Sequence, residues 1–178
     1  MPDTFVTLKE GSKGAEVTKL QQRLKTLKYY AGAIDGNFGP QTKASVINFQ
    51  KKNAVKDDGI VGYETEAAIQ RALWVSQRQT IQEGSKGNDV EKLQTLLQQA
   101  DEINKDHGVV WNVPGGFGIR TDGIFGANTK AAVIKFQQAE KLKADGVVGA
   151  LTWKALSGII TFDLEPIVIV NNDVFDLA

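Results

Sequence analysis

The feature that most constrains this chain is a duplicated pair of glycine-bounded loops. Asp35-Gly36-Asn37-Phe38-Gly39 returns as Asp122-Gly123-Ile124-Phe125-Gly126, and Asp58-Gly59-Ile60-Val61-Gly62 returns as Asp145-Gly146-Val147-Val148-Gly149. In both cases the second copy lies 87 positions after the first. A register held across both loops indicates an internal duplication, and therefore two tandem structural units.

The opening parts of the two copies also match, but the offset between them is smaller. Glu10-Gly11-Ser12-Lys13-Gly14 returns 73 positions later as Glu83-Gly84-Ser85-Lys86-Gly87. The second copy therefore carries 14 extra residues, the difference between 87 and 73, in an insertion at about 102–121. The predicted domains are a first repeat at 1–74, a linker at 75–82, a second repeat at 83–158 and a C-terminal tail at 159–178.

Between the loops, apolar residues recur at the spacing of amphipathic helices. Val17, Leu20 and Leu24 lie three and four positions apart, which places them on one helical face. The phenylalanine of the first loop, Phe38, is expected to point into the core. We predict helices over about 15–28, 40–53 and 63–74 in the first repeat, and over about 88–100, 127–140 and 150–157 in the second.

The insertion and the tail have a different character. Val109–Val113 and Phe117–Thr121 flank Pro114-Gly115-Gly116, a pattern that predicts a β-hairpin with a glycine turn. From Gly158 onward the chain is rich in β-branched residues without helical period, which predicts a strand-like tail. The predicted fold is therefore mainly α, with two tandem three-helix repeats, a hairpin insertion in the second and a strand-like C-terminal tail.

Composition excludes several classes of function. The 21 basic and 21 acidic residues give zero net charge, so no global field attracts nucleic acid. Zinc sites built from cysteine and histidine are excluded, since the chain has no cysteine and a single histidine, His107. We predict no metal and no cofactor. No apolar run is long enough to span a membrane, and Met1–Phe5 lacks the features of a secretory signal.

The repeated motifs resemble a known family, the peptidoglycan-binding domain type 1. The resemblance is carried by G-x-x-G-x-x-V-x-x-L-Q, then D-G-x-F-G-x-x-T-x-x-A-V-x-x-F-Q, then D-G-x-V-G-x-x-T-W, over 8–74 and 81–157. The first repeat departs from the pattern at Glu66, where the second has Trp153. The resemblance implies small three-helix modules that attach to the bacterial cell wall by recognising glycan or stem peptide.

The resemblance also implies a binding groove, for which the loops offer polar groups. Muropeptides present hydroxyls, amides and carboxylates, so a groove needs short polar side chains, backbone amides and an aromatic face for a sugar ring. The predicted ligand-binding residues are Asp35, Asn37, Thr42, Asp58, Tyr63, Trp111, Asp122, Thr129, Asp145 and Trp153. For the aspartates an architectural role in tight turns is the open alternative.

No catalytic residues are predicted. The serines lack a G-x-S-x-G context, and the acids recur at the same turns in both repeats, which favours structure over catalysis. The leading hypothesis is a protein without enzymatic activity that binds peptidoglycan or muropeptide at the cell wall or elsewhere outside the cytoplasm. The alternative is a docking or assembly module that binds another protein through the insertion and the apolar tail, with a cytoplasmic or phage-associated origin still open.

Overall fold

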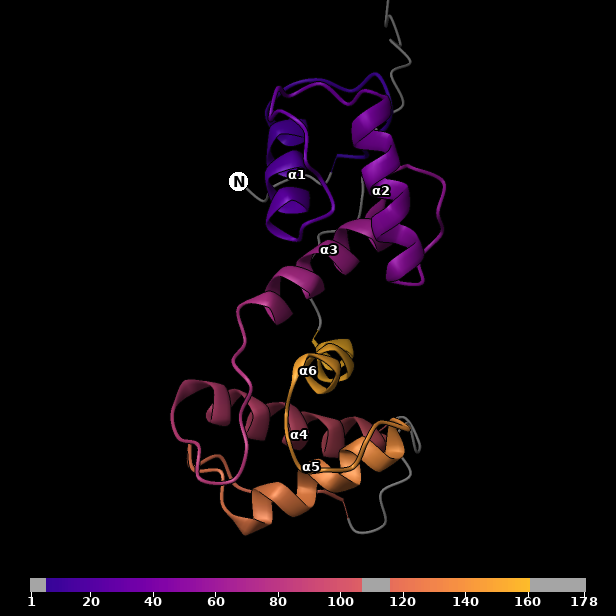
Figure 1. The fold of residues 1–178 in the computed structure, drawn as a ribbon. Coiled ribbons are helices and arrows are strands. Elements are labelled where there is room, and N and C mark those ends of the chain that lie inside the picture. The colour runs from indigo at the N-terminus through magenta and orange to yellow at the C-terminus, as the bar shows by residue number, and fades with distance from the viewer. Residues whose placement is uncertain (1–5, 107–115, 161–178) are drawn as a thin grey trace, which may run out of the picture. The chain divides into compact units, whose positions relative to one another are not determined.

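The computed structural model describes residues 6–106 and 116–160, with the backbone alone for residues 102–106 (Figure 1). The described chain falls into two compact units, one within residues 6–70 and one within 71–160. Its helices are α1 (Ala15–Thr26), α2 (Pro40–Lys52), α3 (Tyr63–Ser76), α4 (Asn88–Asp106), α5 (Ala127–Ala139) and α6 (Ala150–Leu156), followed by a short 3₁₀ helix at Ser157–Ile159. The predicted mainly helical fold, with one set of three helices per repeat, is confirmed.

The helices begin where the glycine loops end. Gly39, Gly126 and Gly149 are the N-cap residues of α2, α5 and α6, each with extended backbone and without a side-chain cap. Pro40 occupies the first position of α2, where its missing N–H leaves no hydrogen bond unmade. The glycine-bounded loops therefore fix the starts of these helices.

Three helices end in the same way, with a residue in the left-handed conformation. Lys28, Ala54 and Lys141 have φ values of 64°, 55° and 56°. At the end of α5, the Leu142 N–H donates to the Gln137 carbonyl at 2.8 Å and the Lys141 N–H donates to the Gln138 carbonyl at 3.1 Å, which are the two bonds of a Schellman motif. This turn directs the chain after α5 back across the unit.

Each unit is pinned by a short backbone pairing between its lead-in and its second loop. In the first unit the Val61 N–H donates to the Leu8 carbonyl at 2.8 Å, and in the second the Val148 N–H donates to the Ile81 carbonyl at 2.8 Å. Ile81 lies in the predicted linker, yet it is buried in the core of the second unit.

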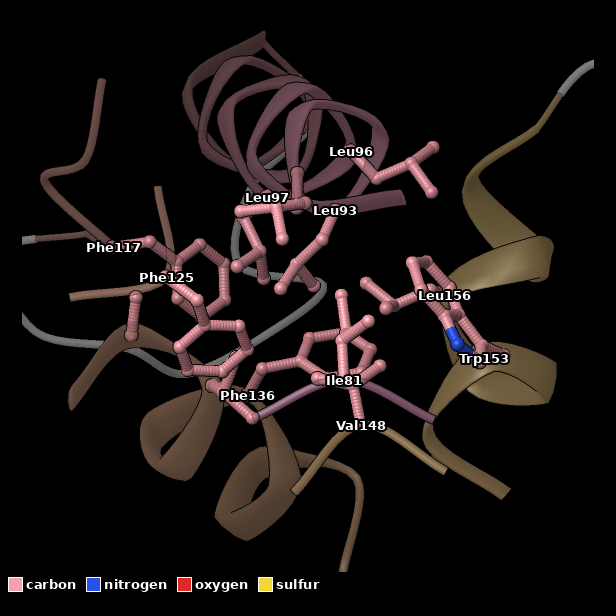
Figure 2. Packing of buried hydrophobic residues seen from close by; sticks show 14 of the residues in the cluster. Ile81, Leu93, Leu96, Leu97, Phe117, Phe125, Phe136, Val148, Trp153 and Leu156 are labelled. Atoms are coloured by element: carbon pink, nitrogen blue, oxygen red, sulfur yellow. The ribbon is translucent and has the colours of Figure 1, made fainter. Parts of the chain in front are cut away.

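The core of the second unit forms where α4 meets α5 and α6 (Figure 2). Trp153 is only 1% exposed, and its ring contacts that of Trp74 edge to face at 5.6 Å between centroids. Its indole Nε1–H donates to the Gln79 carbonyl at 2.8 Å. The other large buried side chains include Leu93, Leu96, Leu97, Phe125, Phe136 and Leu156.

The first unit has a different residue at the position equivalent to Trp153. Glu66 stands where the second repeat has Trp153, and Arg23 stands where it has the buried Leu96. Glu66 and Arg23 form a mostly buried ion pair. Two buried apolar residues of the second repeat are thus replaced by an ion pair in the first.

The predicted β-hairpin at 102–121 is wrong. Helix α4 continues through Asp106, and residues 116–121 contain no strand. The Asp101 carboxylate accepts the Phe117 N–H at 2.8 Å, and Gln98 Nε2 donates to the Ile119 carbonyl at 3.1 Å. Because side chains of α4 satisfy these backbone groups, the segment needs no partner strand. The first arm of the predicted hairpin lies outside the described residues.

The structure describes only the start of the predicted strand-like tail, and that start is not a strand. Ile159, expected to open a strand, ends the 3₁₀ helix instead, and residues 161–178 lie outside the described part of the chain. Within residues 6–106 and 116–160, no helix combines the length and apolar character that a membrane crossing requires.

Candidate functional site

Each of the four loops is organised by one buried glutamine. Gln21 of α1 and Gln50 of α2 serve the loops of the first repeat, and Gln94 of α4 and Gln137 of α5 serve those of the second. All four are at most 1% exposed. A buried amide is stabilising only when its donors and acceptor are satisfied, so each glutamine needs a full set of partners.

The loop supplies those partners in a fixed pattern. Gln137 Nε2 lies 3.3 Å from Asp145 Oδ1, 2.9 Å from the Val147 carbonyl and 3.2 Å from Thr152 Oγ1. Gln137 Oε1 accepts the Gly146 N–H at 2.9 Å. Since Nε2 has two hydrogens, the three oxygens share them. We call this arrangement the glutamine clasp.

The same four partner types recur in the other three loops. Gln21, Gln50 and Gln94 each contact an aspartate Oδ1, the carbonyl two residues later and a threonine hydroxyl, and each accepts a glycine N–H. The clasp therefore explains the spacing D-G-x-x-G-x-x-T in the sequence.

The glycine after each aspartate is required by backbone conformation and by space. Gly146 has a φ of 74°, in the left-handed region that other residues enter at a cost. A Cβ at this position would lie 2.9 Å from Lys130 Cγ, closer than real contacts allow. The equivalent glycines, Gly36, Gly59 and Gly123, have φ values of 68°, 74° and 68°.

Hydrogen bonds lower the pKa of all four loop aspartates. For Asp35 the main cause is the bond from the Gln21 side chain. For Asp58, Asp122 and Asp145 it is the backbone N–H of the residue two positions on, which donates to Oδ1 at 2.9 Å in each loop. Each bond favours the ionised carboxylate, so protonation weakens the loop.

We expect acid to destabilise the folded chain through these aspartates. Because their folded pKa values lie below the ordinary value of 3.8, their stabilisation is present above that pH and is lost as the pH falls through the folded pKa. The urea midpoint, followed by circular dichroism from pH 6 to pH 2, should fall below about pH 4. In the control variant Asp122→Asn the fall should be shallower, whereas an unchanged midpoint at low pH would contradict a role for the carboxylates.

The structure groups the predicted ligand-binding residues loop by loop. Asp35 and Thr42 meet at Gln21, and Asp122 and Thr129 meet at Gln94. Both threonines are buried. Asp58 and Asp145 contact Gln50 and Gln137 in the same way. The Oδ1 atoms and the threonine hydroxyls are therefore parts of the clasps.

The remaining predicted residues lie in different surroundings. Trp153 is in the core of the second unit, whereas Asn37 is exposed and Tyr63 is 43% exposed. Trp111 lies outside the described residues. The docking alternative depends on the insertion and the tail, and its main segments at 107–115 and 161–178 also lie outside them, so it stays a prediction.

One surface cavity adjoins the fourth clasp. It has a volume of about 290 Å³ and lies between the loop after α5 and the start of α6. Of the residues that line it, the sequence predicted only Asp145 as ligand-binding. One difference between the repeats could have indicated the cavity: Ala150-Leu151 occupies the positions where the first repeat has Tyr63-Glu64. The side chains that line it include Leu142, Lys143, Asp145, Val147, Ala150 and Leu151. We call it the α6 cavity.

Across the described ranges, no three acidic or histidine side chains gather where a metal ion would be held.

Comparison with known families decides what these repeats are. The family described as "Putative peptidoglycan binding domain" matches residues 13–69 and 86–156. The chain belongs to this family. Each match falls on one repeat and contains both of its glutamine clasps, so the prediction of tandem peptidoglycan-binding modules is confirmed.

Relatives of these peptidoglycan-binding modules carry the names of an amidase and a cortex-lytic enzyme. The chain is 33% identical over 168 residues to "Probable N-acetylmuramoyl-L-alanine amidase" of Bacillus licheniformis, covering 83% of this chain and 43% of the relative. It is 31% identical over 110 residues to "Spore cortex-lytic enzyme" of Bacillus cereus, covering 62% of this chain and 40% of the relative. The chain thus spans less than half the length of these relatives.

A solved structure also resembles part of the chain. "The crystal structure of SleB N-terminal domain" has 33% sequence identity and a TM-score of 0.37, covering 40% of this chain and 94% of that one.

The relatives correct the prediction that this chain is not an enzyme. An amidase matches most of the chain and a cortex-lytic enzyme matches more than half of it. That prediction is therefore wrong. The absence of a serine-hydrolase motif does not exclude hydrolysis by other sets of residues.

Proposed function

We propose that this chain binds peptidoglycan as part of the hydrolysis of the bacterial cell wall, with its two modules holding the polymer. The observation that carries the proposal is the match of one peptidoglycan-binding family to both repeats of a single chain. The wall-degrading names of the relatives support the link to hydrolysis. Peptidoglycan lies outside the cytoplasmic membrane, so we place the chain at the cell wall.

Two modules on one chain favour avid binding. Once the first module has bound, the second meets the polymer at the effective concentration set by their connection rather than at the bulk concentration. Peptidoglycan repeats the same chemical unit many times, so both modules find equivalent sites on one strand or on neighbours. Binding of the whole chain should therefore exceed that of either module, provided that both bind.

The proposal is tested by sedimentation of the purified chain with insoluble peptidoglycan. We expect saturable removal of the chain from the supernatant, and no removal by insoluble cellulose, which lacks stem peptides. Soluble wall fragments released in the same incubation measure hydrolysis directly. A folded chain, verified by circular dichroism, that stays in the supernatant at all peptidoglycan concentrations would sink the proposal.

A further inference from the structure

We propose that the α6 cavity of the second repeat binds the stem peptide of peptidoglycan rather than its glycan. In this arrangement a small alkyl side chain of the peptide enters the cavity, and Lys143 contacts a peptide carboxylate. The inference rests on the proposed function, and it assigns the peptide contact to one repeat of the two.

The size and the wall of the α6 cavity suit a small alkyl group. Its volume of about 290 Å³ is at the lower limit of small-molecule sites, and Leu142, Val147, Ala150 and Leu151 contribute apolar side chains to it. Leu151 is 72% exposed, so apolar surface is available to a ligand. The hydroxyls of a sugar ring would find no hydrogen-bond partners on this apolar wall, which costs free energy. The methyl group of an alanine side chain needs no such partner and carries no such cost.

Within its described residues, the second repeat offers no exposed aromatic ring on which a sugar could stack. Sugar recognition commonly uses an exposed aromatic face, which packs against the apolar face of the ring. Phe117, Phe125, Phe136 and Trp153 are all at most 4% exposed. The described surface of this repeat is therefore better suited to a peptide than to a glycan.

Lys143 brings a positive charge to the rim of the α6 cavity. The Lys143 side chain is 88% exposed, and its Nζ lies 3.3 Å from Asp145 Oδ2. Asp145 Oδ1 is held by the Val147 N–H and by Gln137. An exposed ion pair of this kind contributes little to stability, so the ammonium group can turn to a ligand carboxylate at small cost. Stem peptides supply such carboxylates.

The two repeats differ at some of the positions that line the α6 cavity. Lys56 and Asp58 repeat the Lys143 pair in the first repeat, at 3.1 Å, so the basic residue is common to both. At the positions of Ala150 and Leu151, however, the first repeat has Tyr63 and Glu64, both exposed. A bulky ring and a carboxylate there oppose a small alkyl group and an acidic ligand. The peptide site therefore belongs to the second repeat.

The test exchanges these residues between repeats. The double variant Ala150→Tyr/Leu151→Glu gives the second repeat the rim of the first, and Tyr63→Ala/Glu64→Leu is the matched variant in the first repeat. All four positions are exposed, so both variants should fold. The probes are a synthetic stem pentapeptide and a peptide-free glycan oligomer, each titrated into the labelled full chain and followed by NMR shifts.

We expect the pentapeptide to shift the amides of residues 142–152. The Ala150→Tyr/Leu151→Glu variant should bind it at least tenfold more weakly, and the matched variant should bind it no more weakly than the unaltered chain. Lys143→Gln should weaken binding and reduce its dependence on salt, because a screened charge contact is removed. These results together would support the inference.

Two results would overturn it. One is shifts at residues 142–152 caused by the glycan oligomer and not by the pentapeptide. The other is undiminished pentapeptide binding by the Ala150→Tyr/Leu151→Glu variant. In either case sedimentation with insoluble peptidoglycan still reports on the proposed function, so a chain that sediments but fails these tests loses only the peptide assignment.

Discussion

Replacing Gln21 with leucine should lower the free energy of unfolding of the first unit by about 3–4 kcal/mol. Leucine is similar in size but loses the bonds that Gln21 makes to Asp35 Oδ1, to the Asn37 carbonyl and to the Gly36 N–H. The Gly36 N–H bond is buried, so its donor would lose its hydrogen bond without gaining water. Urea denaturation followed by circular dichroism measures the change, and hydrogen exchange of the loop amides locates it.

The neighbouring glutamine provides a matched control. Gln22 is exposed, so Gln22→Leu makes the same chemical change at the adjacent position and leaves the clasp intact. We expect its effect to stay within about 0.5 kcal/mol. Equal losses of stability in the two variants would show that the clasp contributes no more than a surface glutamine.

Truncating Trp153 to alanine should destabilise the second unit by about 3–5 kcal/mol. The ring is buried, and its removal leaves a cavity beside Trp74 and takes the donor away from the Gln79 carbonyl. Trp153→Phe keeps an aromatic ring but not the hydrogen bond, so it should cost less. Circular dichroism is the suitable measurement, since the substitution itself alters tryptophan fluorescence.

Leu151 supplies the control for this second prediction. It lies two positions earlier on α6 and is largely exposed, so Leu151→Ala should change the unfolding free energy by less than about 0.5 kcal/mol. Retention of full stability by Trp153→Ala would instead mean that the core closes over the vacated space.

Helix positions were predictable because their signal is local. The starts of all six helices agree with the predicted ones, and five of the ends agree within two residues. Helix periodicity and glycine loops act over a few residues, so neither needs knowledge of tertiary contacts. α4 runs to Asp106, six residues beyond the predicted end.

The hairpin prediction failed because tertiary contacts override β-branched composition. Phe117 and Ile119 have the alternation of a strand, but their backbone groups bond to Asp101 and Gln98 of α4. Such partners lie 16 and 21 residues apart in the sequence. No pattern within the segment itself reveals them.

The sequence contains a pattern from which the clasp could have been predicted. The pairs Leu20-Gln21 and Phe49-Gln50 recur as Leu93-Gln94 and Phe136-Gln137, so a polar residue repeats beside the buried apolar positions. A glutamine that returns at a buried position four times needs partners, and the loop aspartates and threonines were the available ones. The α6 cavity left a weaker signal, a difference between repeats at two positions.

The clasp also makes these modules a natural scaffold for grafting new segments. The glutamine and its aspartate are separated by 14, 8, 28 and 8 residues in the four loops, yet in every loop Nε2 contacts Oδ1, at 2.8 to 3.3 Å. Lengthening such a connection from 8 to 28 residues costs only about 1 kcal/mol in closure entropy. A displayed peptide inserted ahead of Asp35 or Asp122 would thus be closed at its base by bonds that do not depend on its length.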